Sequence, residues 1–288
     1  MTPRGLFATG QELGAATLPD ELIEAHPAMF PNGATARRYC GNFYFPRSGR
    51  WIYQLNGKSG NSSTLALLFE LEFGVPFGVK MVSPTNQHPD FALFELCRAG
   101  VFGNPLLQGL SLADFDALPG LRIATVRNPF TRAVSSFLYL CRSQKLGDVR
   151  FVLERLRLQA LVGFDWAQHD GTPEGFLRFL EYIRLLQTEG TPDMIDAHWL
   201  PQVQHIQPAV YRPDLIGRTE DMAGFVLALA DRLGQTAPQR LAARNRTPAR
   251  PDLFARFYAD PAAADLVRRI YAADFETFGY DPQDVKPA

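Results

Sequence analysis

The stretch Gly57-Lys58-Ser59-Gly60-Asn61-Ser62-Ser63 sets a single lysine among small and hydroxyl-bearing residues. An apolar run at 52–55 precedes it and a periodic apolar pattern at 65–71 follows it, which predicts a strand, a tight loop and a helix. Small side chains let an anion reach the loop N–H groups, and the start of a helix favours negative charge. Lys58 adds a full charge and the serines add hydroxyls, so the stretch predicts a phosphate site.

Two other interpretations of this loop stay open. Gly57-Lys58-Ser59 matches the end of the P-loop pattern G-x-x-x-x-G-K-[ST], but Ile52, inside the expected strand, stands where the first glycine belongs. The loop can also be an ordinary serine-rich turn with a solvated lysine. The residues that decide between these interpretations lie further along the chain.

A second strand-loop-helix unit has its own anion chemistry. The apolar run 121–126 predicts a buried strand, and Arg127 follows it directly. Pro129 suits the first turn of a helix, where its missing N–H costs nothing. Ser135 comes about two helical turns later, so the Arg127 guanidinium and the Ser135 hydroxyl could grip one phosphate. The alternative is a structural helix start without a ligand.

Composition limits the classes of function. The chain has 288 residues, of which 46% are hydrophobic and 20% charged, as in a globular protein. A formal net charge of −1 argues against a general nucleic-acid binder. Cys40, Cys97 and Cys141 are far apart and without metal-ligand spacing, so we expect free buried thiols and a reducing compartment. No apolar run is long enough for a membrane span, and we expect no signal peptide.

The elements that must position these residues alternate between strands and helices. Residues 1–38 read as an irregular arm with one short helical possibility at 19–25, and residues 39–288 as a single α/β domain. Residues 40–46 and 50–53 predict two strands joined by a turn. Further strands are expected at 78–82, 121–126 and 215–218, and helices at 90–96, 153–161, 173–186, 223–233 and 260–278.

Taken together, these motifs resemble the carbohydrate sulfotransferases that use 3′-phosphoadenosine 5′-phosphosulfate (PAPS). Residues 58–63 resemble the 5′-phosphosulfate loop of that family, and Arg127 to Ser135 resemble its 3′-phosphate motif. His198-Trp199-Leu200-Pro201-Gln202, the stretch 215–220 and the closing stretch 271–280 are similar to the membrane-type Golgi branch. Gly57, Asn61 and Thr64 depart from the usual residues of the loop.

The resemblance implies a P-loop-like three-layer α/β fold with a central, mainly parallel sheet flanked by helices. It implies an enzyme that moves a sulfuryl group from PAPS to an acceptor hydroxyl, here of a saccharide, with Lys58 as a catalytic charge and no metal. The implied donor contacts come from Lys58, Ser59, Gly60, Asn61, Ser62, Ser63, Arg127, Ser135, Arg244, Asn245 and Thr247. Without a visible membrane anchor, we expect a cytoplasmic, bacterial member.

The acceptor hydroxyl needs a general base. We expect His88, between the two phosphate motifs, to fill this role, with His198 or a carboxylate such as Asp90 or Glu95 as the alternatives. A basic run from Arg142 to Arg157 could attract an anionic acceptor or form a solvated helix face.

Two rival functions remain at this point. One is a P-loop kinase or nucleotidase that uses ATP, and the other is a non-catalytic nucleotide- or glycan-binding module. The sequence leaves the oligomeric state open.

Overall fold

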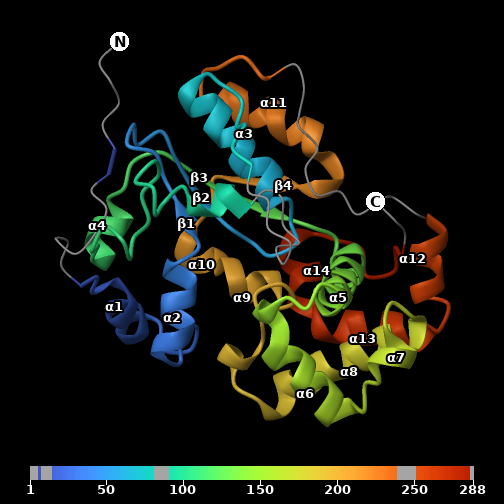
Figure 1. Cartoon of the computed structure of the whole chain (residues 1–288). Coiled ribbons are helices and arrows are strands. Elements are labelled where there is room, and N and C mark those ends of the chain that lie inside the picture. The colour runs from blue at the N-terminus through green and yellow to red at the C-terminus, as the bar shows by residue number, and fades with distance from the viewer. Residues whose placement is uncertain (1–5, 8–14, 81–90, 239–250, 286–288) are drawn as a thin grey trace.

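The computed structural model describes residues 6–7, 15–80, 91–238 and 251–285. At its centre lies a sheet in the order β1 (Phe43–Tyr44), β2 (Trp51–Gln54), β3 (Leu121–Val126) and β4 (Leu215–Arg218) (Figure 1). β1 pairs with β2 in antiparallel orientation, whereas β2, β3 and β4 are parallel. The expected α/β class, with a mainly parallel sheet between helices, is confirmed.

The two faces of the sheet belong to different cores because side chains alternate along a strand. Trp51 and Tyr53 of β2 face the core that includes α3 (Asn61–Phe73) and α11 (Met222–Arg232). Ile52 faces the opposite core, together with α2 (Gly33–Cys40) and α10 (Pro208–Tyr211). Figure 1 shows α3 and α11 together on one side of the sheet. The described part of the chain thus forms helix, sheet and helix layers.

A helical lobe packs beside this sheet (Figure 1). Its apolar core is formed by α5 (Pro129–Lys145), α6 (Val152–Val162), α8 (Pro173–Glu189), α12 (Pro251–Phe257), α13 (Pro261–Ile270) and α14 (Ala272–Phe278). The shorter helices are α1 (Leu18–Ala25), α4 (Leu112–Asp116), α7 (Trp166–His169) and α9 (Gln202–Ile206). Four 3₁₀ turns complete the described elements: η1 (Phe91–Glu95), η2 (Val149–Phe151), η3 (Pro192–Met194) and η4 (Thr219–Asp221). Because α5 follows β3 directly, this lobe is anchored at the end of the central strand.

Three local expectations need correction. The expected helix 260–278 is divided into α13 and α14 at Tyr271, whose φ of −114° and ψ of 25° leave the helical region. Residues 78–80 are not in a strand, and the rest of the stretch 78–82 lies outside the described residues. The arm is partly regular, because α1 buries Leu18 and Leu22 and α2 buries Ala36 in the core on one face of the sheet. The division of the chain at residue 38 stays a prediction.

Two further expectations concern cysteines and membranes. Cys40, Cys97 and Cys141 are free and buried, as their spacing indicated. Among the helices that the structure describes, none has the length and apolar character needed to cross a membrane.

Candidate active site

The Lys58 loop connects β2 to α3 through two left-handed residues, Lys58 with φ 65° and Gly60 with φ 80°. A non-glycine residue in this region is strained by on the order of 1 kcal/mol, and such strain gathers at functional sites. Gly60 occupies the N-cap of α3 and supplies no side-chain cap for the first turn. Gly57 is needed for close approach, because a Cβ there would lie 2.3 Å from the Ala197 carbonyl oxygen. The loop is therefore pressed against residues 197–198.

The Lys58 ammonium group lies 4.0 Å from the centre of the Tyr139 ring, in a cation–π contact. Burial, and to a lesser extent the charges of Arg127, Arg132 and Arg142, together lower the pKa of Lys58 to about 7. Lys58 as a whole is partly exposed to solvent, but its ammonium group is surrounded by protein atoms. This concentration of positive charge favours a multiply charged anion.

One face of α5 carries the second motif. The Arg127 Nε donates to the Thr131 hydroxyl at 3.0 Å. Thr131, Ser135 and Tyr139 follow at intervals of four residues, so they share that face. Arg127, the buried Ser135 and the aromatic partner of Lys58 are thereby aligned along one helix. Sequence reasoning missed Thr131 and Tyr139, which the four-residue spacing from Arg127 could have indicated.

The neighbouring row of α5 ties the Lys58 loop to the segment 196–198. The Arg132 Nε donates to the Gly57 carbonyl at 2.8 Å, and Nη2 donates to the Ala197 carbonyl at 3.3 Å. The Ser136 hydroxyl lies 2.6 Å from the His198 carbonyl oxygen. Arg132 is only 1% exposed, and its buried Nη1 has no hydrogen-bond partner. An unpaired buried guanidinium nitrogen is costly unless an acceptor reaches it.

Gln202 joins the two phosphate motifs. Its side-chain oxygen accepts from the Ser59 hydroxyl at 3.0 Å and from the Arg127 N–H at 2.9 Å. Its side-chain nitrogen donates to the Arg127 carbonyl at 2.8 Å. The carboxylate of Asp274 accepts from the backbone N–H groups of Gln202 and Val203 at the start of α9, at 2.9 Å each. A single buried amide thus fixes both loops relative to each other.

These contacts can be set beside comparisons with known proteins. A family model described as "Sulfotransferase family" matches residues 119–281, which is more than half of the chain. The chain belongs to the sulfotransferase family. Members of this family are PAPS-dependent enzymes, so this chain is a PAPS-dependent sulfotransferase. The match starts just before β3 and includes Arg127, Gln202 and Asp274, whereas the Lys58 loop precedes it. Neither the curated proteins nor the solved structures give a match to the chain.

Within this sulfotransferase, the loop residues expected to bind the donor also shape the loop. The Asn61 side-chain oxygen accepts from the Tyr53 hydroxyl at 2.9 Å and from the Asn56 N–H at 3.1 Å. The Ser59 hydroxyl is buried, bonded to Asn56 and Gln202. Ser62 is buried and Ser63 is partly exposed in the first turn of α3. Their contacts with the donor stay predictions.

Glu220 supports the start of α5 in the same enzyme. Its carboxylate accepts from the Asn128 N–H at 2.7 Å and from the Tyr280 hydroxyl at 3.0 Å. The Arg218 guanidinium lies 4.8 Å from the centre of the Tyr280 ring. The stretches 215–220 and 271–280, which resembled family motifs, therefore meet beside Arg127. Sequence reasoning gave these residues no role.

Several expected site residues cannot be placed. His88, Asp90, Arg244, Asn245 and Thr247 lie outside the described residues. Glu95 is partly exposed and forms an ion pair with Arg98 at 3.5 Å.

The basic run is engaged in contacts within the protein. Arg155 is buried and bonded to the Ser143 hydroxyl and the Asp148 carbonyl, and Lys145 pairs with Asp170 at 3.1 Å. Arg157 lies 4.0 Å from Glu154, and Arg150 donates to the Tyr139 hydroxyl at 2.8 Å. These contacts favour a structural interpretation of the run over an acceptor site.

Proposed function

We propose that this sulfotransferase transfers the sulfuryl group of PAPS to a hydroxyl group of a saccharide. The observation that carries the proposal is the gathering of Lys58, Arg127 and Arg132, whose burial and mutual charge lower the pKa of Lys58 to about 7. Such a cluster is stabilised when a ligand with several negative charges binds. PAPS carries a phosphosulfate and a separate phosphate, which suits two adjoining anion motifs.

Lys58 and the start of α3 would hold the 5′-phosphosulfate. Sulfuryl transfer needs the acceptor oxygen, sulfur and leaving oxygen in line, and it needs charge neutralised on the departing phosphate. Lys58 would supply that charge, helped by the N–H groups of Gly60, Asn61, Ser62 and Ser63. The Arg132 Nη1, buried without a partner, is a further donor close to the loop. The cationic and N–H donor set fits PAPS without a metal.

Arg127 and Ser135 would hold the 3′-phosphate, which anchors the donor away from the reacting sulfur. Their alignment along α5 supports this assignment, and Thr131 orients the Arg127 guanidinium. Arg244, Asn245 and Thr247 remain our proposed cover over the nucleotide. The saccharide acceptor rests on the similarity of stretches 198–202, 215–220 and 271–280 to the membrane-type branch.

The experiment that tests this function is calorimetric titration with 3′-phosphoadenosine 5′-phosphate (PAP), beside adenosine 5′-phosphate and magnesium-ATP. We expect PAP to bind tightly in the presence of a chelator and the other two nucleotides to bind weakly. Preference for magnesium-ATP would contradict the donor site.

Turnover is tested separately with sulfur-labelled PAPS and a panel of heparosan, chondroitin and dextran. Transfer of label to a saccharide is the expected result. PAP binding without transfer of label to any saccharide of the panel would contradict the proposed acceptor class.

A further inference from the structure

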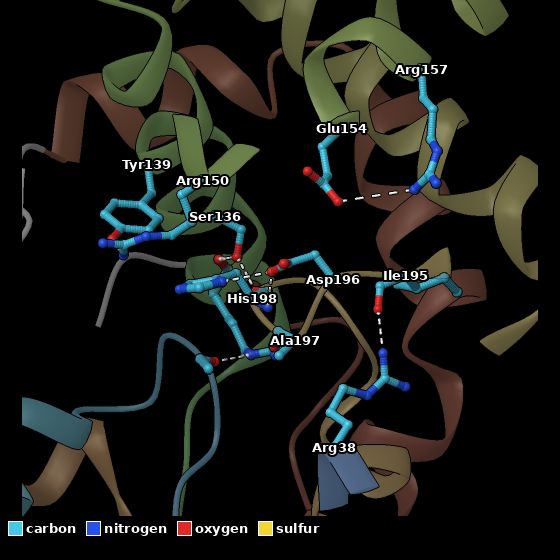
Figure 2. A network of polar contacts seen from close by, with 12 residues as sticks. Arg38, Ser136, Tyr139, Arg150, Glu154, Arg157, Ile195, Asp196, Ala197 and His198 are labelled. Atoms are coloured by element: carbon cyan, nitrogen blue, oxygen red, sulfur yellow. Dashed lines mark hydrogen bonds and ion pairs between the residues drawn. The ribbon is translucent and has the colours of Figure 1, made fainter. Parts of the chain in front are cut away.

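Asp196 and His198 form a hydrogen-bonded pair just before α9. Nδ1 of His198 lies 2.6 Å from the Asp196 carboxylate oxygen Oδ1, and the His198 backbone N–H donates to the same oxygen at 2.8 Å (Figure 2). Burial opposes ionisation of Asp196, but the adjacent His198 and its hydrogen bonds hold the pKa of this carboxyl below its usual value. An ionised carboxylate only accepts, so in the neutral imidazole the hydrogen lies on Nδ1 and Nε2 presents a lone pair.

This pair adjoins the expected position of the sulfuryl group. The His198 ring packs on the Tyr139 ring at 5.1 Å, and the Lys58 ammonium lies 4.0 Å from the same Tyr139 ring. The Lys58 ammonium nitrogen therefore lies no further from the centre of the His198 ring than the sum of these two distances. The His198 side chain is 27% exposed, so an acceptor can reach it.

Contacts on both sides hold the pair in place. Arg38 of α2 donates to the Ile195 carbonyl at 2.8 Å, and the Ser136 hydroxyl lies against the His198 carbonyl (Figure 2). The Phe151 ring packs edge-on against His198 at 5.2 Å. A general base must be held within hydrogen-bond distance of the proton that it removes. These contacts restrain the segment that carries His198.

We propose that His198 is the general base of the transfer and that Asp196 is its positioning residue. This inference rests on the proposed function. Nε2 of His198 takes the proton of the acceptor hydroxyl while that oxygen forms a bond to sulfur. The bond between sulfur and the 5′-phosphate oxygen breaks, its electron pair stays on that oxygen, and PAP leaves beside Lys58. Asp196 stabilises the imidazolium until the proton passes to solvent.

His88 is the competing candidate and lies outside the described residues. The described chain resumes at Phe91, whose ring lies 5.8 Å from the Arg150 guanidinium, and Arg150 itself donates to the Tyr139 hydroxyl. Substitution of each histidine separates the two candidates.

The test uses His198→Gln, His88→Gln and Asp196→Asn, with His26→Gln as the matched histidine control. PAP affinity is measured by calorimetry. Single-turnover release of PAP from PAPS is measured from pH 5.5 to 9 with the same saccharide panel, water serving as the alternative acceptor. We expect His198→Gln to bind PAP within threefold of the unmutated protein and to release it at least a hundredfold more slowly. His26→Gln should keep both properties within threefold, and His88→Gln tests the competing candidate.

The pH profile separates the proposed role from a structural one. Asp196→Asn keeps an acceptor for Nδ1 but removes the charge that favours imidazolium, so the acidic limb of the profile should move to lower pH. The other charged groups around the pair are unchanged in this variant: Lys58, Arg38, Arg150, Glu154 and Arg157.

A His198→Gln rate within threefold of the unmutated protein would overturn the assignment, as would an unmoved acidic limb in Asp196→Asn. Loss of turnover in His88→Gln alone would transfer the role to His88. Failure of the unmutated chain to bind PAP or to turn over PAPS would contradict the proposed function itself, and this assignment with it.

Discussion

Lys58 combines burial, a strained backbone and cationic neighbours in one residue. Its pKa is about 7 in the folded protein and about 10.4 in an unfolded chain. Between these values the unfolded state binds more protons, so folding stability should rise as the pH rises. We expect the unmutated protein to gain stability from pH 7 to pH 9 relative to Lys58→Met, measured by urea unfolding of both proteins at each pH. Parallel pH dependence of the two proteins would contradict the lowered pKa.

The same residue should couple donor binding to protonation. A phosphate group near the ammonium favours the charged form, so PAP binding at pH 8 should be accompanied by proton uptake. Calorimetry in buffers of different ionisation enthalpy measures this uptake. Lys58→Met is expected to abolish it and to slow transfer by about a hundredfold or more, because one such charge is typically worth ~2.7–4 kcal/mol in the transition state.

At the scale of elements, the short helix α9 positions both anion loops through its first residue. Gln202→Ala would remove the buried acceptor of the Arg127 N–H and of the Ser59 hydroxyl. We expect it to lower the free energy of unfolding by about 2–3 kcal/mol and to weaken PAP binding at least tenfold. Gln204 is an exposed residue of the same helix. Gln204→Ala should change the free energy of unfolding by less than about 0.5 kcal/mol and the PAP affinity by less than twofold. Equal effects of the two substitutions would argue against the bridge.

The β2–α3 loop depends on the glycine at its start. Gly57→Ala would bring a Cβ within 2.3 Å of the Ala197 carbonyl oxygen, and both contacting groups are backbone. Backbone atoms cannot move aside as a flexible side chain can, so the loop and the segment 196–198 must separate. We predict that turnover falls more than tenfold while the far-ultraviolet circular dichroism stays unchanged. Gly33→Ala is the control, because a Cβ at Gly33 meets nothing within 4 Å and the backbone there, as at Gly57, is not left-handed.

For the whole molecule, the proposed donor site lies where the sheet meets the helical lobe, so a bound donor should stabilise both together. At a concentration one hundred times its dissociation constant, PAP should add about 2.7 kcal/mol to the free energy of unfolding. With an unfolding entropy of about 2.1 cal/mol/K per residue, this raises the melting temperature of a chain of this size by roughly 4–5 °C. Adenosine 5′-phosphate should produce a smaller shift at equal concentration. Arg127→Ala should remove the difference between the two nucleotides, which differential scanning calorimetry can measure.

Local patterns predicted much of this architecture. The runs that became β2, β3 and β4 and the helices α6, α8 and α11 were readable because burial imposes periodicity on each segment. The turn at Tyr271 was missed, since the helical pattern continues across it. The short strand predicted at 78–82 failed in its described part, because a short apolar run carries no information about its pairing.

The sequence predicted those site residues whose own neighbours in the sequence indicate their role. Lys58 and Arg127 each follow a strand and open a helix, which marked them. The Gln202 bridge spans 143 residues to Ser59, and no single segment encodes such a contact. Asp196 and His198 are only two residues apart in the sequence. Their place in the candidate site, however, depends on contact with Tyr139, which belongs to α5.

The placement of the Lys58 amine against Tyr139 also gives the enzyme an unusual chemical handle. At neutral pH about half of an amine with a pKa near 7 is unprotonated, whereas an ordinary lysine is less than about 0.1% unprotonated. The free base is the nucleophile toward acylating reagents. A dilute, amine-selective ester should therefore label Lys58 ahead of the surface lysines, with PAP shielding it. The charge that neutralises a leaving phosphate would then double as the attachment point for a covalent probe of this site.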